Sequence, residues 1–258
     1  MLNESNLVLL AALVLAVLLA AGSAGLWVGR RRARQEGEQG LTQVSVVQGA
    51  MLGLLGLLLG FTFSMAVSRY DARKGLVIDE ANSIETAYLR AQVLPQPLRA
   101  ESQELFKEYI AIRVRSSQSA LDDVQQAAFE SSAATVFNHL WAKAMAAVER
   151  DIHGDALTSY VEALNAMNDV RAGRNAALEN HVPPSVLYLL VVIAALSVAY
   201  LGYGFGLTRQ RGKLTIATLS IAITLVIAVI IDIDRPRRGL VQISQQSLLE
   251  LQKHISGR

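Results

Sequence analysis

The sequence predicts an all-α, polytopic membrane protein with four transmembrane helices and a helical-bundle domain inserted between the second and the third. Three observations lead to this prediction. More than half of the 258 residues are apolar and only 18% are charged, a composition that is unusual for a soluble domain of this size. Four uncharged apolar runs are long enough to cross a hydrocarbon core about 30 Å thick, which takes roughly 20 helical residues. The residues between the second and third runs are far more polar and follow a helical pattern.

The predicted transmembrane helices cover about residues 7–28, 44–67, 186–205 and 214–231, and none contains Asp, Glu, Lys, Arg or His. No basic residue precedes the first span, where Asn3, Glu4 and Asn6 stand instead, whereas a cleaved secretory signal begins with a positively charged segment. We therefore expect the first run to remain as a span. Ionisable residues inside a membrane usually mark proton relays or ion-coupled transport, so their absence argues against a transporter of that kind.

Residues 68–182 are predicted to form a water-exposed bundle of four helices. The first helix continues out of the second span to about residue 93, because Pro95 and Pro97 follow and cannot extend it. Asp155 is the expected N-cap of the last helix. Apolar residues at steps of three and four favour antiparallel packing of the three later helices, at about residues 98–117, 121–150 and 155–178.

The remaining segments complete the predicted domain organisation. Residues 1–67 hold the first two spans and the basic loop between them. Pro183 and Pro184 mark the junction with the third span, so residues 183–232 hold the last two spans. Residues 233–258 are left as a C-terminal tail.

Basic residues in the two short loops predict how the chain lies in a bacterial plasma (inner) membrane. Such residues tend to stay in the cytoplasm, and both loops lie on one side of a four-span protein. The large inserted domain would then be extracytoplasmic. Basic residues also flank the opposite side, spread through longer segments of mixed charge. The loop residues are Arg30, Arg31, Arg32, Arg34, Arg209, Arg211 and Lys213, and those opposite are Arg69, Arg73, Lys74, Arg235, Arg237 and Arg238.

The second span carries glycines on a rhythm of four, three and four residues, at Gly49, Gly53, Gly56 and Gly60. Small residues on one helical face let another backbone approach closely in lipid, which predicts helix packing there. The same face is also a candidate pore lining, because a pore can be built by packing copies of this helix around an axis. Phe61 and Phe63 follow the last glycine and would narrow such a pore by excluding water. The candidate pore-lining residues are Gly53, Gly56, Gly60, Phe61 and Ser64.

A charged collar follows the second span, where the helix is predicted to meet water. Arg69 and Arg73 are four residues apart with Asp71 between them, and Lys74 comes next. Side chains of this kind commonly anchor a helix at the membrane edge. Several copies of the collar around an axis would instead focus a positive field, which makes Arg69, Arg73 and Lys74 candidate vestibule charges that attract anions.

The sequence offers little support for catalysis, metal binding or nucleic-acid binding. Residues 151–155 (DIHGD) contain three possible metal ligands, but a helix stop followed by a new helix start explains them better. No catalytic residues and no cofactor are expected, because nucleophile motifs, phosphate-binding loops and recognisable carboxylate pairs are missing. The formal net charge is only +2, and the membrane flanks account for the basic residues, so no nucleic-acid surface is expected. The chain contains no cysteine, which excludes disulfides and thiol chemistry.

Several short patterns resemble those of bestrophins and of a bacterial bestrophin-like family. Residues 57–61 (LLLGF) followed by 69–74 (RYDARK) are similar, with a one-residue gap, to the second helix of bestrophins. The bestrophin-like family shares the four-span layout and is the closer match. Its pattern is found in residues 80–82 (EAN), 87–90 (AYLR), 94–95 (LP), 232–236 (DIDRP), 239–240 (GL) and Ser244, and the resemblance covers most of the chain.

This resemblance implies an oligomeric channel, because bestrophins are pentameric anion channels whose second helix lines the pore. It places Phe61 and its neighbours near a constriction and makes chloride or other small anions the expected permeant ions. Two features depart from bestrophins. The acidic clasp that binds calcium there has no counterpart here, and bestrophins keep the domain after the second helix in the cytoplasm, opposite to the side that the loop arginines predict.

Two functions are therefore open from the sequence. The first is a homo-oligomeric, passive anion channel in the lipid bilayer, with the second span lining the pore. The alternative is a non-conducting, membrane-anchored sensory or partner-binding module whose extracytoplasmic bundle receives the partner. A stalked helical bundle suits such a module, although no output domain follows in this sequence.

Overall fold

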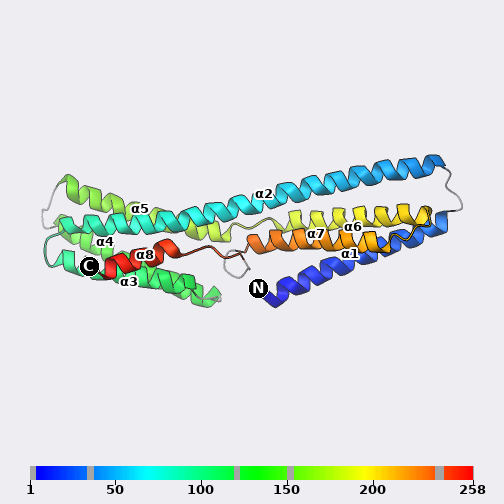
Figure 1. The fold of residues 1–258 in the computed structure, drawn as a ribbon. Coiled ribbons are helices and arrows are strands. Elements are labelled where there is room, and N and C mark those ends of the chain that lie inside the picture. Colours follow the sequence, from blue (N-terminus) through cyan, green and yellow to red (C-terminus); the bar gives the residue numbers. More distant parts are fainter. Residues whose placement is uncertain (1–3, 34–37, 119–122, 150–153, 236–240, 258) are drawn as a thin grey trace. The chain divides into compact units, whose positions relative to one another are not determined.

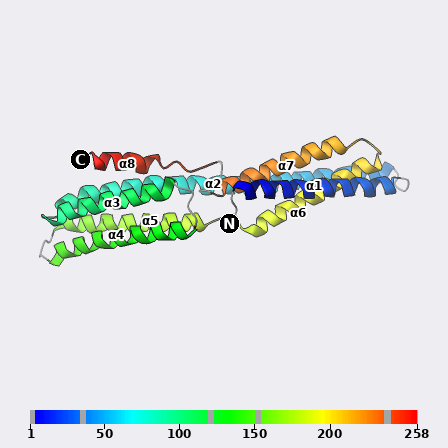
Figure 2. The same ribbon diagram turned by 90° about the horizontal axis from the view of Figure 1, so that it is seen from below.

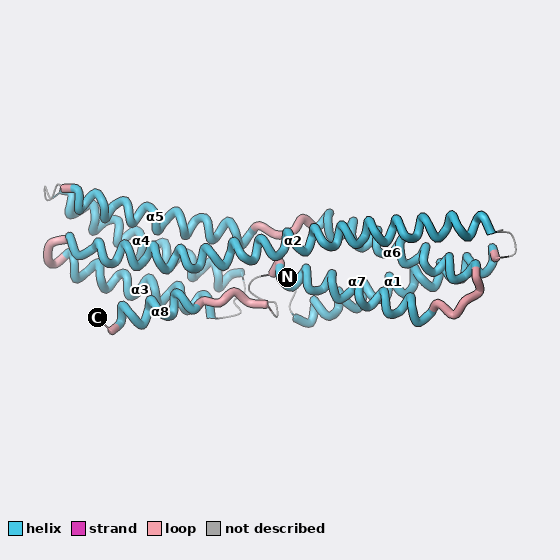
Figure 3. The backbone as a smooth tube through the Cα atoms, turned by 45° about the horizontal axis from the view of Figure 1, so that its top comes forward, coloured by secondary structure: helices cyan, strands magenta, loops and turns pink. Residues whose placement is uncertain are grey.

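The computed structural model describes residues 4–33, 38–118, 123–149, 154–235 and 241–257. Within these ranges the chain forms helices and connecting loops and no strand (Figure 3), which confirms the all-α prediction. The helices are α1 (Glu4–Arg32), α2 (Glu38–Arg90), the short 3-10 helix η1 (Ala91–Val93), α3 (Leu98–Gln118), α4 (Asp123–Glu149), α5 (Asp155–Glu179), α6 (Pro184–Leu207), α7 (Lys213–Ile233) and α8 (Gln246–Ser256).

The chain divides into two compact units. The first unit comprises Met1–Tyr70 and His181–Gln242, and the second comprises Asp71–Asn180 and Ile243–Arg258. Helix α2 belongs to the first unit up to Tyr70 and to the second from Asp71 onward. It therefore supplies one helix to each unit, as expected for a helix that continues beyond its span.

Among the described residues, four helices are long and apolar enough to cross a membrane, which confirms a four-span membrane protein. They lie within Leu7–Arg32, Leu41–Val93, Asp155–Leu207 and Lys213–Ile233. In the third range the apolar part is α6, because α5 carries several charged residues and α6 carries none. Pro184 is the first residue of α6, a position where its missing N–H costs no helical hydrogen bond.

In the first unit, α1 and α6 approach so closely that only glycine fits at their contact (Figure 2). A Cβ atom on Gly25 would lie 1.9 Å from the carbonyl oxygen of Ala199, and one on Gly202 would lie 2.1 Å from the carbonyl oxygen of Gly22. Near the end of α1, a Cβ on Gly29 would lie 2.2 Å from the Tyr203 oxygen. This glycine contact is a packing device typical of helices in lipid, and the sequence analysis did not identify it.

An apolar core joins α1, α2, α6 and α7 of the first unit. Leu18 and Val198 are fully buried in it, and Leu55 contributes from α2. The hydroxyl group of Ser197 donates to the Ile193 carbonyl oxygen 2.8 Å away, one turn back in the same helix. Local bonding of this kind satisfies a hydroxyl in an apolar environment, and the same hydroxyl lies 3.4 Å from the Met51 carbonyl oxygen of α2.

In the second unit, the last part of α2 is joined by η1, α3, α4 and α5, with α8 alongside α3 (Figure 1). Helix α8 buries Leu248, Leu251 and Ile255 and exposes its polar side chains, so it is amphipathic. Its side chains also reach α2, where the Nδ1 atom of His254 lies 3.1 Å from Glu85 Oε1. Residues assigned from the sequence only to a C-terminal tail therefore include a packed helix of this unit.

The ends of the helices follow the expected residue chemistry, with one correction. The chain leaves η1 at Leu94, which is extended, just before Pro95 as predicted. Asp155, however, is the first residue of α5, and Gly154 takes the N-cap position without any side-chain capping bond. The N-cap prediction for Asp155 is therefore wrong by one residue, because glycine is also accepted at that position.

Candidate functional site

The four glycines of α2 lie on a surface that no other helix of the chain covers. All four are exposed. A Cβ atom built on Gly49, Gly53, Gly56 or Gly60 would meet no atom within 4 Å outside its own helical backbone. The opposite side of the helix is packed, since Leu55 and Ala66 are buried. Within this chain the glycine face therefore has no packing partner among the described residues, and its proposed roles concern what lies outside one chain.

Ser64 and the two aromatic residues extend this exposed surface in different directions. A helix turns about 100° per residue, so Ser64 lies about 40° and Phe61 about 100° around the axis from Gly60. Phe63 lies about 60° from Gly60 on the other side. Phe61 is 66% exposed and Phe63 is 41% exposed. Both aromatic rings are thus free of the chain's own core, and Phe63 points closer to the glycine direction.

Arg69 ends the apolar part of α2 in the first unit. Its Nη2 atom lies 3.8 Å from the sulfur atom of Met65, one turn back. Its Nη1 atom is buried and has no hydrogen-bond partner among the described residues. A guanidinium group with an unsatisfied N–H can donate a hydrogen bond to an anion or to an ordered water molecule.

Arg73 and Lys74 follow in the second unit and have different surroundings. Arg73 is 3% exposed. It donates hydrogen bonds to the carbonyl oxygens of Ala177, at 3.1 Å, and Asn180, at 2.9 Å. These are carbonyl groups at the end of α5, which lack intrahelical partners, so Arg73 caps that helix. Lys74 is exposed. Of these two members of the predicted collar, Arg73 is bound to the end of α5 and Lys74 is exposed to solvent.

The second unit contains a buried ion cluster, made of Glu80, Arg113, Glu130 and Arg174, that the sequence analysis missed. Glu80 is completely buried, Arg113 is 2% exposed and Arg174 is 8% exposed. The Nε atom of Arg113 lies 2.6 Å from Glu80 Oε1, and its Nη1 atom lies 2.6 Å from Glu130 Oε1. Arg174 pairs with the other oxygen of Glu80. The four charges come from α2, α3, α4 and α5 and sum to zero, which makes their burial tolerable.

Neutral side chains complete the hydrogen bonding of this ion cluster. Asn175 donates to Glu130 Oε2 at 3.0 Å, and Arg174 donates to Gln245 Oε1 at 3.1 Å, just before α8. Burial alone would raise the pKa of Glu130, but the charge of Arg113 and the bonds from Asn175 and Arg113 lower it below its usual value. Burial raises the pKa of nearby Tyr109 to about 12. The cluster therefore holds Glu130 ionised and ties the segment before α8 to α5.

Two aspartates at the end of α7 organise the chain connections of the first unit. Asp234 accepts a hydrogen bond from the backbone N–H of Val182 at 3.0 Å, and its Oδ2 atom lies 3.5 Å from Nδ1 of His181. Asp232 accepts from the backbone N–H of Val241 at 3.1 Å. Both aspartates are buried. Asp234 thus holds the entry to α6, and Asp232 holds the exit from α7.

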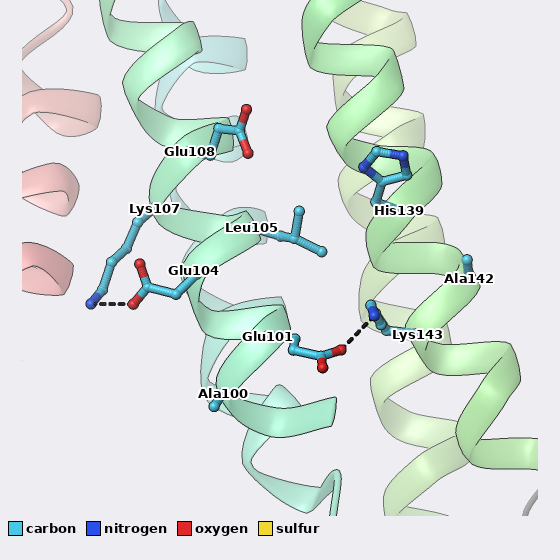
Figure 4. A pocket seen from close by; sticks show the side chains of 9 residues that line it. All are labelled: Ala100, Glu101, Glu104, Leu105, Lys107, Glu108, His139, Ala142 and Lys143. Atoms are coloured by element: carbon cyan, nitrogen blue, oxygen red, sulfur yellow. Dashed lines mark hydrogen bonds and ion pairs between the residues drawn. The ribbon is translucent and has the colours of Figure 1, made fainter. Parts of the chain in front are cut away.

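A groove lies between α3 and α4 on the second unit (Figure 4). Lys143 of α4 pairs across it with Glu101 of α3, and Lys107 pairs with Glu104 at 3.0 Å along α3. His139 also lines it. The lining therefore mixes acidic and basic groups on an open surface, where ion pairs contribute little to stability.

The possible metal ligands of residues 151–153 lie outside the described residues. Asp155, the remaining member of that group, begins α5. Among the residues that the structure describes, no group of three or more His, Cys, Asp or Glu side chains is placed to hold a metal ion.

A family model described as the Bestrophin-like domain matches residues 16–248 of the chain. No curated protein matches the chain in a sequence search. The range matched by the family model includes every candidate pore-lining and vestibule residue of α2.

Solved structures show the same fold. A crystal structure of a membrane protein matches with a TM-score of 0.66 and 11% sequence identity, covering 94% of this chain and 97% of that one. A variant of a bacterial bestrophin homologue from Klebsiella pneumoniae matches with a TM-score of 0.64 and 11% identity, covering 92% of this chain and 96% of the other. A second variant of that homologue has the same TM-score and identity and covers 95% and 98%.

Proposed function

The chain belongs to the bestrophin-like family, and we propose that it assembles into a homo-oligomer that conducts small anions such as chloride passively, with α2 lining the pore. One observation carries this proposal. The glycine face of α2 is exposed, and no atom of the described residues lies within 4 Å of a Cβ built on these glycines, outside their own helical backbone, although α1, α6 and α7 contact one another. A helix that packs on one side and leaves a small-residue stripe free on the other suits a position around a shared axis.

The proposed pore surface consists of Gly53, Gly56, Gly60, Phe61 and Ser64. The glycines leave a wide, apolar stretch, and Ser64 adds a hydroxyl group that can interact with a passing anion. Aromatic rings beyond the last glycine would form the constriction and gate by excluding water. Gly49 lies near the start of the same stripe and is assigned to packing between copies.

Positive charge beyond the constriction would favour anions. Arg69 has an unsatisfied donor and Lys74 is exposed, so each is a candidate to attract an anion to the pore mouth. Arg73 contributes to the positive field only from a buried position, because α5 carbonyl groups hold its guanidinium. No ionisable residue lies within the apolar part of α2, which suits passive conduction better than proton coupling.

We further place the protein in a bacterial inner membrane with the second unit extracytoplasmic. The support is the excess of arginine and lysine in the two short loops. A reporter that is active only in the periplasm, fused after residue 258, tests this placement directly. Activity of the fusion supports it, and activity of a cytoplasmic reporter at the same site places the second unit inside, as in bestrophins.

The conduction proposal is tested with the purified oligomer in planar bilayers. Wild-type protein should carry a chloride current, and Phe63→Ala should raise it by removing part of the constriction. Leu54→Ala is the control, because Leu54 is also exposed on α2 but lies about 180° around the helix axis from Phe63. Absence of current over a wide range of voltage and calcium, with the oligomer intact, would refute the proposal.

The non-conducting module is the second candidate, and the groove between α3 and α4 is the feature that favours it. A partner would bind there through the mixed charges of Glu101, Glu104 and Lys143. An electron-microscopy projection of the oligomer separates the two functions. A water-filled central axis supports the channel, and a monomer or an axis-free dimer supports the module.

A further inference from the structure

A small pocket lies between α2 and α6 in the first unit, at the basic end of the helices. Its volume is about 180 Å³. The polar part of the lining comes from Ser45, Gln48, Thr208 and Gln210, and the apolar part from Leu41, Val44, Leu201, Gly204 and Phe205. The pocket therefore combines polar groups with an apolar wall at the end of two membrane-spanning helices.

Two side-chain amides in this pocket have N–H groups that donate to no described residue. The hydroxyl of Ser45 already donates to the Thr42 carbonyl oxygen at 2.8 Å, and that of Thr208 donates to the Gly204 carbonyl oxygen at 3.2 Å. The amides of Gln48 and Gln210 make no hydrogen bond to any described residue. Each amide offers two N–H donors, which suits oxygen atoms of a ligand.

Basic side chains that form no ion pair with a described carboxylate gather at the same end of the unit, and one of them, Arg31, stacks on the ring of Trp27 at 3.6 Å. The ends of α1 and α6 are in contact there, since a Cβ on Gly29 would lie 2.9 Å from the Cα of Gly206. Six basic side chains follow these ends, all exposed, and none forms an ion pair with a carboxylate of the described residues. They are Arg30, Arg31, Arg32, Arg209, Arg211 and Lys213.

Arg209 adopts a backbone conformation that ordinarily favours glycine. Its φ angle is 53°, in the left-handed region that costs a non-glycine residue about 1 kcal/mol or more. The turn around it is closed by hydrogen bonds, from Gln210 N–H to the Phe205 oxygen and from Gly212 N–H to the Gln210 oxygen. This turn ends α6 and places Arg209 directly before Gln210, a lining residue of the pocket.

We propose that this pocket binds the phosphate headgroup of an anionic phospholipid from the surrounding bilayer. The amides of Gln48 and Gln210 would donate to the phosphate oxygens, and the unpaired basic residues would balance its charge. The apolar part of the lining, which includes Leu41, Leu201 and Phe205, offers a surface for the acyl chains. The site is separate from the glycine face, so it does not depend on conduction.

Native mass spectrometry of the full-length protein tests the site. The protein is titrated with phosphatidylglycerol and with phosphatidylcholine of the same acyl chains, and lipid retained per chain is counted. We expect phosphatidylglycerol to be retained at roughly tenfold lower concentration than phosphatidylcholine, because nearby basic residues favour a net negative headgroup. Equal retention of the two lipids would overturn the proposal.

Two substitutions of Gly204 test whether the preference for phosphatidylglycerol depends on this pocket. Gly204→Leu fills the pocket and should abolish the preference for phosphatidylglycerol. Gly204→Ala should keep the preference, because its Cβ would meet only the end of the Gln48 side chain, at 3.1 Å, and a methyl group of Val44, at 3.5 Å. A well-folded Gly204→Leu protein that keeps the preference contradicts the assignment.

Charge variants test the same site without altering its shape. Arg209→Gln combined with Arg211→Gln should weaken phosphatidylglycerol retention by roughly tenfold. Arg115→Gln combined with Lys253→Gln changes the net charge equally at exposed positions of the second unit and should leave retention unchanged. An equal loss in both double variants, or displacement of the lipid by glycerol 3-phosphate alone at similar concentration, overturns a lipid-specific site.

Discussion

Helices α1 and α6 of the first unit meet through glycines, whereas the helices of the second unit meet around four buried charges. At the glycine contact the backbones themselves touch, and a Cβ on Gly25 would lie 1.9 Å from the Ala199 oxygen. In the second unit, Arg113 lies 2.6 Å from carboxylate oxygens of both Glu80 and Glu130. In lipid, close packing of small residues replaces the hydrophobic effect as the source of helix association. A bundle outside lipid can instead specify its packing with a buried, balanced ion cluster.

The comparison also explains the free glycines of α2. Gly25 and Gly53 belong to apolar stretches of similar composition, yet the first is sealed against another backbone and the second has nothing within 4 Å. A glycine rhythm in a span thus indicates a surface that permits close approach. The glycine spacing does not specify what lies against that surface, which can be another helix of the chain, a helix of a second copy or the water of a pore.

The largest expected effect is on the ion cluster. Glu80→Gln preserves shape but leaves Arg113 and Arg174 without their shared carboxylate, and removing one partner of a buried pair costs about 3–5 kcal/mol. The second unit of the variant should therefore unfold at a much lower urea concentration than that of the wild type. Trp27→Phe leaves Trp141 as the only tryptophan, so its fluorescence follows the second unit in the full chain. An unchanged midpoint would show that the cluster contributes little.

A matched pair of alanine substitutions tests the glycine comparison. Gly25→Ala forces α1 and α6 apart, and overpacking of this kind costs about 1–3 kcal/mol. Gly53→Ala meets open space and should leave the chain as stable, or about 0.5–1 kcal/mol more stable, since alanine is the better helix former. Urea unfolding in detergent, followed through Trp27 in a Trp141→Phe background, measures both. Equal destabilisation by Gly25→Ala and Gly53→Ala would contradict the assignment of Gly25 to a close helix contact and of Gly53 to an open surface.

The smallest expected effect is the response of the second unit to acid. The pKa of Glu130 is lowered in the folded state, so its contribution to stability is complete above its unfolded value and is lost as the pH falls through the folded value. Unfolding followed through Trp141 should therefore become easier below about pH 4. Glu130→Gln should flatten part of this dependence. A profile identical in wild type and variant would contradict the assignment to Glu130.

Within the bundle, some packing positions could be predicted and others could not. Phe106, Tyr109 and Ile110 lie on the apolar stripe expected from their spacing, and all three are buried. Arg113 follows on the same side of α3 and is equally buried. Its spacing alone gave no sign of this, because a charge is buried only where another helix supplies the opposite charge. Glu80 of α2 supplies that opposite charge.

What the sequence determined by itself was the set of spans, the helical character of the inserted domain and the family. The spans and the helical domain follow from local composition and periodicity, since each apolar run must lie in lipid whatever its neighbours are. The family was identified by the resemblance of short sequence patterns. Only the tertiary structure decided that Gly25 is sealed and Gly53 is open, that Arg73 caps α5, and that α8 packs in the second unit. Those outcomes depend on which residues distant in the chain come to lie opposite one another, and the same short pattern is compatible with several such arrangements.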